Sequence, residues 1–395
     1  MKALKLFALL IGLICCISSC GDDSTSGSDD ELVRITLTNP NADTIKNYGL
    51  DLDLIPVDSN LELMANDQAL LFQLEDRNVN GLPDKLFTFL DLLPNSTHII
   101  VGQAATEAAA KPVKRVQALL MDAQSGKHLT TYVYQESNQL RHQGIVMEND
   151  LIAYRALMQT SFAFDIIGKR FKELVIDTKP DISQEDKWGG DILNEANSLG
   201  IGAPALYNLD GIVRLDKFDS REVQVLANGP LRAEIQTVVK GVPVRDEKVD
   251  VQINMEMQAG NQWIEVDLQI LSSTDLTLQF AFGLPKHDDA TDFTQGLESA
   301  VHFAYTHGLQ SAQGEQLGMA LLVPEIYELD HYREDPFDYY YLATPIDKKV
   351  TYRLLAAWVK GQRTIFDEVD FLNFVRDQAK TLGRKPAVKV EWNQG

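Results

Sequence analysis

Apolar and polar residues alternate at every second position through most of this chain. Residues 33–38 alternate and end at Asn39-Pro40, and residues 50–54 alternate again. Successive side chains of a β-strand point to opposite faces of the sheet, so this period predicts strands with one buried face. The same pattern, interrupted by turn residues, predicts further strands at 113–121, 129–135, 145–155, 172–176, 211–215, 221–227, 231–239, 248–257, 263–271, 276–282, 300–306 and 318–323. Such a series is typical of a large antiparallel β fold.

The spacing of apolar residues changes from two to three and four only near the C-terminus. Val369, Leu372, Phe374 and Ala379 recur at intervals of three and four, which predicts one amphipathic helix within residues 366–381. Gly383 is expected to end this helix, and a last strand is expected at 387–392. The hydrophobic pattern therefore predicts a mainly β, all-β-class fold with one C-terminal helix.

The first 20 residues have the features of an export signal. A short basic segment precedes an apolar run from Leu6 to Ile17, and Ser18-Ser19-Cys20 follows. This order matches a bacterial lipoprotein signal and predicts lipidation of Cys20; an ordinary secretory signal is the alternative, and it also implies export. Residues 21–32, rich in Ser, Gly and Asp, are expected to form a flexible tether. We therefore expect an exported, periplasm-facing protein that meets the membrane only through its anchor, with the outer membrane favoured.

The rest of the chain divides at a stretch of small residues, 104–110. We expect an N-terminal β-section at 33–110 and a larger β body at 111–395. All three cysteines lie within the first 20 residues, so neither part is expected to contain a disulfide, a thiolate metal site or a cysteine nucleophile.

The net charge of −21 affects which partners are plausible. With 57 Asp and Glu against 36 Lys and Arg, the surface should repel nucleic acid and anionic membranes. An anionic sugar would need a local group of cations, because salt screens charges over about 10 Å.

The stretch from Arg141 to Gly202 concentrates polar residues and glycines among strand-like apolar ones. Read as a strand, residues 148–155 place Asn149, Ala153 and Arg155 on one face. An amide and a guanidinium in line would suit an anionic ligand. The alternative is a structural ion pair beside an Asn turn.

The order of motifs in this stretch resembles that of a known family. Glu-Asn-Asp-x-x-Ala-x-Arg begins at Glu148, Asp-x-x-Gly-Lys at Asp165, Trp-Gly-x-Asp at Trp188 and Ser-Leu-Gly-x-Gly at Ser198. Together they resemble a bacterial domain-of-unknown-function family of polysaccharide-utilisation lipoproteins that includes the ulvan oligosaccharide dehydratase. The segments 229–233 and 263–268 also resemble strands of the galactose-mutarotase-like supersandwich, which implies a β-supersandwich body.

The resemblance implies a lyase that removes water from the non-reducing-end uronic acid of oligosaccharides such as ulvan fragments. That reaction takes the proton from C5, next to the carboxylate, and expels the C4 hydroxyl, so it needs a neutralising cation, a base and an acid. The candidate catalytic residues are His142, Arg155, His307, His331 and Tyr332. The candidate substrate-binding residues are Asn149, Lys169, Trp188, Asp191, Tyr305 and Arg333.

Other interpretations stay open at this point. Each candidate could be structural, and Trp188 in particular is either a platform for a sugar or a core residue. A non-catalytic glycan-binding lipoprotein would show aromatic residues over an open face. A mutarotase-like epimerase or a glycoside hydrolase would show a carboxylate pair flanking a pocket.

No cofactor is expected, apart from a possible calcium ion at Asp76, Asn78, Asn80 and Asp84. Their spacing is that of a calcium loop, but the twelfth place is Phe87 and not the glutamate that an EF-hand requires. A hairpin turn at Asn80-Gly81 accounts for the same residues without a metal.

Overall fold

The computed structural model describes residues 31–54, 61–66, 68–78, 80–105, 112–135, 139–158, 162–193, 197–363 and 365–393, with the side chains of 331–334 excepted. The expected signal, the lipidation residue Cys20 and most of the tether lie outside these ranges. Among the described residues, no helix has the length and apolar character needed to span a bilayer.

The N-terminal β-section consists of two antiparallel sheets that enclose their own core. One sheet has the order β27 (Ala387–Trp392), β1 (Glu31–Asn39), β7 (Ser96–Ala104), β3 (Leu61–Ala65) and β4 (Gln68–Leu70). The other has the order β2 (Ile45–Asp53), β6 (Lys85–Leu92) and β5 (Phe72–Glu75). Val33, Ile35 and Leu37 of β1 point into this core, as their alternation predicts.

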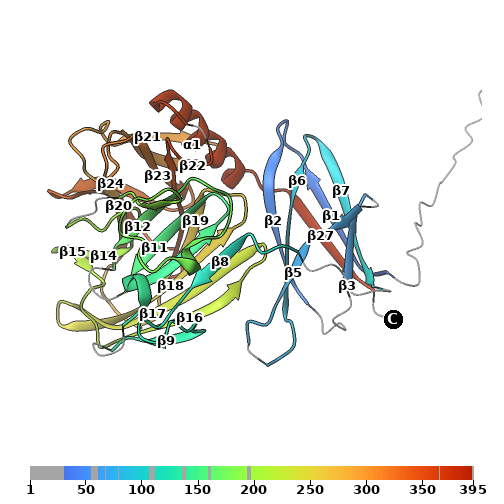
Figure 1. Ribbon diagram of the computed structural model, residues 1–395, viewed down its shortest axis with the longest axis horizontal. Coiled ribbons are helices and arrows are strands. Elements are labelled where there is room, and N and C mark those ends of the chain that lie inside the picture. Colours follow the sequence, from blue (N-terminus) through green and yellow to red (C-terminus); the bar gives the residue numbers. More distant parts are fainter. Residues whose placement is uncertain are drawn as a thin grey trace, which may run out of the picture.

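The last strand lies in this section and not in the body. Residues 387–392 do form a strand, but β27 pairs with β1, with Ile35 opposite Val390. In Figure 1, β27 runs in red beside the blue strands of the N-terminal section. We expected this strand in the body because it follows the body in sequence; its partner is more than 350 residues away along the chain.

The body is a large sandwich of antiparallel strands. Its largest sheet has the order β21 (Thr294–Glu298), β22 (Val301–Gly308), β23 (Leu317–Pro324), β26 (Lys349–Trp358), β19 (Trp263–Ile270), β18 (Glu247–Gln258), β17 (Arg232–Val244), β16 (Ser220–Asn228) and β9 (Thr131–Val133). A second sheet has the order β13 (Gly189–Asp191), β12 (Phe164–Lys169), β11 (Ile152–Leu157), β10 (Gly144–Asn149) and β8 (Val116–Leu119). A third has the order β15 (Gly211–Arg214), β14 (Ala205–Asn208), β20 (Gln279–Pro285), β25 (Asp338–Ala343) and β24 (Leu329–Glu334).

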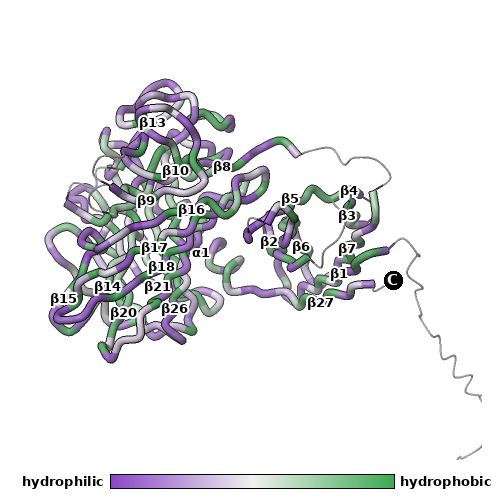
Figure 2. The backbone as a smooth tube through the Cα atoms, turned by 90° about the horizontal axis from the view of Figure 1, so that it is seen from below, coloured by the Kyte–Doolittle hydropathy of each residue, from purple (hydrophilic) through white to green (hydrophobic). Residues whose placement is uncertain are grey.

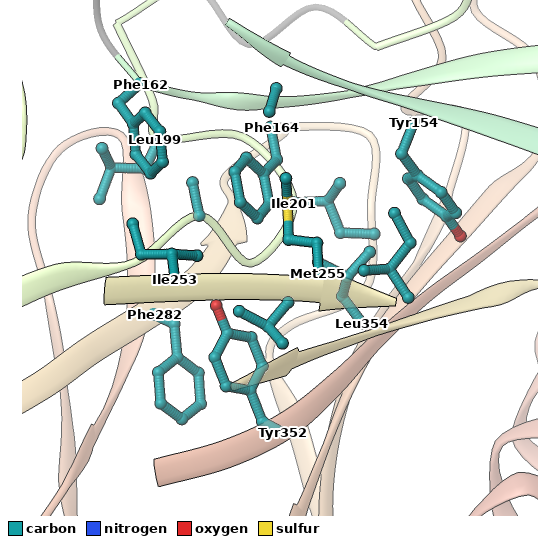
Figure 3. Packing of buried hydrophobic residues seen from close by; sticks show 14 of the residues in the cluster. Tyr154, Phe162, Phe164, Leu199, Ile201, Ile253, Met255, Phe282, Tyr352 and Leu354 are labelled. Atoms are coloured by element: carbon teal, nitrogen blue, oxygen red, sulfur yellow. The ribbon is translucent and has the colours of Figure 1, made fainter. Parts of the chain in front are cut away.

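The main core lies between the nine-stranded sheet and the two five-stranded sheets. Figure 3 shows Met255 and Leu354 of the large sheet packing toward Phe164 and Ile201. Hydrophobic and hydrophilic residues alternate along the tube in both parts of the chain (Figure 2). The prediction of an all-β supersandwich with a small N-terminal β-section and one late helix is confirmed.

Helix α1 (Glu368–Gly383) covers part of the outer face of the nine-stranded sheet. Asp367 caps its first turn by accepting from the amide of Asp370, and Phe371 and Val375 are buried against the sheet. Gly383 is required where the helix ends, because a Cβ there would lie 1.9 Å from the carbonyl oxygen of Ser299. The predicted helix is confirmed within two residues at each end.

Two expectations for strands are wrong. Residues 145–155 form two paired strands, β10 and β11, joined by a turn at Asp150-Leu151, so Asn149 and Arg155 do not share one strand. The strand expected at 172–176 does not form. This segment is irregular and leads into a short 3₁₀ helix, Ile176–Thr178. The backbone amides of Val175 and Ile176 donate to the carboxylate of Glu148 and not to a neighbouring strand.

Candidate functional site

Arg155 lies on the outer face of the β8–β13 sheet, beneath the loops that follow β12. Its side chain is 8% exposed, and its guanidinium donates to the carboxylates of Asp165 and Asp191, the latter at 2.6 Å. Burial, together with the charge of Asp191, raises the pKa of Asp165. The guanidinium therefore already has two carboxylate partners, as in the structural alternative, and its role toward a substrate stays a prediction that this geometry does not support.

The neighbouring candidates Lys169 and Asn149 are also engaged within the protein. The Lys169 ammonium contacts the Glu148 carboxylate at 2.8 Å, and both side chains are fully buried. The Asn149 amide donates to the backbone carbonyls of Gln258 and Asn261, and its oxygen accepts from two amides of its own turn. These contacts fasten the β10–β11 turn to the large sheet.

Trp188 is a core residue in this arrangement. It is 6% exposed and packs in a small cluster with Val146, Ala153 and Ile167, while the Lys179 ammonium lies 5.5 Å from its ring centre. Asp191, which follows it in the motif, is the second partner of Arg155. The motif that carries the family resemblance thus holds the loops of this sheet in place.

His142 lies close enough to Arg155 for the guanidinium charge to affect the protonation of its imidazole. It sits in a short 3₁₀ turn, Arg141–Gln143, with a φ of 58°. Burial and the nearby cations Arg141 and Arg155 lower the pKa of His142 to about 4. The imidazole is therefore neutral at pH 7, and no described residue bonds to its buried Nε2.

Tyr305 and His307 occupy one face of β22, and that face lies beneath α1. The Tyr305 hydroxyl donates to Glu368 at 2.9 Å, and the His307 ring stacks on Phe371 with ring centres 5.7 Å apart. The structure therefore does not bring them together with Arg155. His331, Tyr332 and Arg333 lie in β24, on the edge of the third sheet, and their side chains are outside the described part.

The possible calcium loop connects β5 to β6 as a hairpin. Asp76 accepts from the amides of Asn80 and Gly81, and Asp84 accepts from those of Arg77 and Asn78. Backbone amides thus use the oxygens that a calcium ion would need, which agrees with the hairpin alternative. Calcium binding stays untested.

A cleft of about 970 Å³ lies between the N-terminal β-section and the outer face of the nine-stranded sheet. Strands β2 and β6 form one wall, strands β17, β18, β19 and β26 form the other, and the segment that follows α1 lies at its rim. Figure 1 shows the two parts side by side, with α1 above the body near the junction. None of the candidate residues named from the sequence lines this cleft.

Two glutamates face each other on the sheet wall of the cleft. Glu256 of β18 is the register partner of Glu265 of β19, and Glu265 is the partner of Arg353 of β26. Their neighbours Met255 and Val266 point into the core on the opposite face. The two carboxylate side chains are 21% and 24% exposed, so both reach the cleft while losing most of their contact with water.

The two carboxyl groups have different environments. Burial raises the pKa of Glu256 to about 7; Arg232 acts against this shift and Glu265 adds to it. The Glu256 carboxylate accepts from Arg232 at 3.2 Å and from the Gln258 amide at 2.8 Å. Glu265 accepts instead from the Nε of Arg353 at 2.8 Å. A carboxyl held protonated beside a second carboxylate gives a site one group that can donate a proton and one that can accept it.

Arg232 of the body connects the N-terminal β-section to this pair of glutamates. The guanidinium of this residue is 2% exposed and donates to Glu75 of β5 and Asp51 of β2, each at 2.7 Å, as well as to Glu256. Its charge lies 4.2 Å from the centre of the Phe87 ring. Both parts of the chain therefore contribute to the site.

The charge of the cleft differs from that of the whole chain. Five basic residues line it, against four acidic ones, in a protein of net charge −21. The basic residues are Lys46, Arg232, Arg353, Arg384 and Lys385, and the acidic residues are Asp51, Glu256, Glu265 and Glu325. Three of these cations are paired with carboxylates that lie outside the lining, namely Glu75, Asp43 and Asp91, so an anionic ligand would depend on the cations that keep donors toward the cleft.

The fold and the site define a two-part, mainly β protein with a pair of glutamates in the cleft between its parts. The chain belongs to the family described as domain of unknown function (DUF4861), whose model matches residues 30–388. Membership of a family of unknown function is thus confirmed, whereas the link to ulvan stays a prediction.

Comparison with solved structures gives distant similarities. An α-mannosidase from Enterococcus faecalis V583 aligns with 92% of this chain at 10% identity and a TM-score of 0.48; the alignment covers 46% of that structure. A glycosyl hydrolase family 38 protein from Enterococcus faecalis gives 10% identity, a TM-score of 0.47 and coverages of 92% and 48%. This chain thus spans about half the length of either protein.

A putative aldose 1-epimerase from Klebsiella pneumoniae subsp. pneumoniae MGH 78578 aligns with 68% of the chain and 96% of its own length, at 8% identity and a TM-score of 0.34. No curated protein matches the chain by sequence.

Proposed function

We propose that this protein is a carbohydrate-active enzyme whose active site is the cleft between its two β parts. The observation that carries the proposal is the opposed pair Glu256 and Glu265 in a cleft that both basic and acidic residues line. The volume of about 970 Å³ lies near the upper end of the usual range for ligand pockets, about 300–1,000 Å³. Amide and aromatic residues such as Gln258, Asn261 and Tyr48 also line it, and these groups suit the hydroxyls and ring faces of a sugar.

The reaction that we propose is dehydration of the non-reducing-end uronic acid of polysaccharide-derived oligosaccharides, such as ulvan fragments. Glu265 takes the proton from C5, the electrons of the broken C–H bond form the C4–C5 double bond, and the C4–O bond breaks. Glu256 gives its proton to the departing hydroxyl, which leaves as water. Glu256 suits the role of acid because a pKa of about 7 leaves it substantially protonated at neutral pH.

The same pair favours a second candidate function, retaining glycoside hydrolysis. Glu256 and Glu265 are directly opposed on neighbouring antiparallel strands, so one sugar can reach both carboxyl groups. Retaining hydrolases need their two carboxyl groups about 5–5.5 Å apart. In that reaction Glu256 would protonate the glycosidic oxygen and Glu265 would attack the sugar carbon.

The test is incubation of the wild-type protein with uronate-ended oligosaccharides. Dehydration predicts ultraviolet absorbance from a conjugated double bond and the mass loss of one water. The variants Glu256→Gln and Glu265→Gln should lose about 10²–10⁴-fold in rate, and Glu222→Gln, on β16 of the same sheet, serves as the matched control. New reducing ends without the double bond would favour hydrolysis instead, and binding without any product would favour a glycan-binding lipoprotein.

The sequence further supports the proposal that the enzyme is exported and anchored through Cys20. A Cys20→Ser variant should then move from the membrane fraction to the soluble fraction. Recovery of this variant in the membrane fraction would contradict lipidation at Cys20.

A further inference from the structure

Arg353 presents an oriented guanidinium on the sheet wall of the cleft. Its Cζ lies 3.9 Å from the centre of the Trp263 ring, and its Nε donates to Glu265 at 2.8 Å. Trp263 is 3% exposed and therefore cannot move aside easily. A guanidinium stacked on a fixed ring and bonded at Nε loses most of its freedom to rotate.

The terminal nitrogens of this guanidinium are not used within the described part of the protein. A guanidinium has five N–H donors, and the Nε donor of Arg353 is the only one for which a described residue provides an acceptor. The side chain is 14% exposed and belongs to the lining of the cleft, so the remaining donors face it. Two parallel N–H groups form the fork that binds a carboxylate through both oxygens.

Three other cations of the cleft, unlike Arg353, already use terminal nitrogens in contacts with carboxylates. Arg232 is bound by Glu75 and Asp51, Arg384 contacts Asp43 at 2.7 Å, and Lys46 contacts Asp91 at 2.7 Å. Lys385 is exposed at the rim, and an ammonium lacks the planar fork.

We propose that Arg353 binds the acidic group of the sugar and makes the cleft selective for sugar acids; this inference rests on the proposed function. Arg353, Glu265 and Glu256 lie opposite one another on three successive strands, so a carboxylate held by Arg353 would leave the adjacent ring carbon nearer to Glu265 than to Glu256. This order matches the base and acid roles assigned above, because C5 carries the carboxylate and C4 carries the hydroxyl.

Binding measurements test this inference separately from turnover. In a Glu256→Gln background, which prevents reaction, calorimetry would compare three ligands. They are a glucuronate-ended disaccharide, its methyl ester, and a disaccharide that carries a sulfate ester but no carboxylate. We expect the free acid to bind at least tenfold more tightly than the methyl ester, and Arg353→Gln should abolish this preference. Tighter binding of the sulfate ester than of the carboxylate would overturn the assignment to a sugar carboxylate.

Two further variants serve as controls. Arg353→Lys keeps the charge but lacks the fork, so it should fold normally and lose most of the preference, whereas Lys240→Gln, which lies outside the cleft beside Glu222, should retain it. If the preference survives Arg353→Gln in a folded protein, the inference is wrong even when wild-type turnover is normal. If the preference depends on Arg353 but no product forms, the proposed reaction is wrong and the assignment of Arg353 stands.

Discussion

Replacing Glu256 by Gln should stabilise the protein relative to wild type increasingly as the pH rises. The folded-state pKa of this carboxyl is about 7, against an ordinary value of 4.5. A carboxyl whose pKa is raised by folding resists ionisation in the folded state. Wild type therefore loses stability as the pH rises from about 4.5 through 7, and a Gln at this position does not titrate.

The size of this effect follows from the two pKa values. Each pKa unit corresponds to about 1.4 kcal/mol. The raised pKa of Glu256 lowers the unfolding free energy of wild type by about 1 kcal/mol at pH 5 and by about 3 kcal/mol at pH 8. The difference in unfolding free energy between Glu256→Gln and wild type should therefore change by about 2 kcal/mol between these pH values. Any fixed cost of the substitution, such as a weaker contact with Arg232, cancels in this comparison.

Urea denaturation at pH 5 and pH 8 measures this change, with Glu222→Gln as the control. The side chain of Glu222 is 45% exposed and pairs with Lys240 on the surface, so its substitution should show a much smaller change. The reasoning would be refuted if the difference between Glu256→Gln and wild type were the same at both pH values. The same result would remove the physical basis for Glu256 as the acid.

Three other predictions follow from the contacts described. Arg155→Ala should lower the unfolding free energy by about 3–5 kcal/mol, because it leaves two buried carboxylates without their cation; unchanged stability would contradict the structural role. Gly168→Ala should cost about 1–3 kcal/mol by overpacking, since its Cβ would lie 2.6 Å from the Trp358 ring, and an unshifted thermal melt would argue against this packing. The turnover rate should fall above about pH 7 as Glu256 loses its proton, and a rate that stays flat well above that pH would show that a different group supplies the proton.

The fold could be predicted from the sequence because its main signal is local. Alternation at period two, as at Val33, Ile35 and Leu37, is enforced wherever one face of a strand is buried. The position of β27 could not be predicted, because the pairing of Ile35 with Val390 depends on two segments far apart in the chain. The strand expected at 172–176 failed because buried Glu148 takes the amides of that segment.

The site could not be predicted in the same way. Arg155 and Lys169 stand out in the sequence, yet in the structure they are buried and paired with carboxylates. Their motifs therefore supply the partners that buried charges need. Glu256 and Glu265 look like ordinary solvent-face residues of alternating strands. They form a candidate site only because the strand register places them opposite each other and because the N-terminal β-section covers them. The nearest signal was the pair of segments 229–233 and 263–268, which resemble supersandwich strands in their sequence and contain Arg232 and Glu265.

The central claim is that the chemistry takes place in the cleft and not at the Arg155 cluster. The most direct measurement compares turnover of one uronate-ended oligosaccharide by folded Glu256→Gln and His142→Gln variants. We predict that Glu256→Gln loses at least about 100-fold in rate and that His142→Gln retains the wild-type rate. Loss of turnover in His142→Gln, with full activity in Glu256→Gln, would contradict the claim and place the reaction beside Arg155.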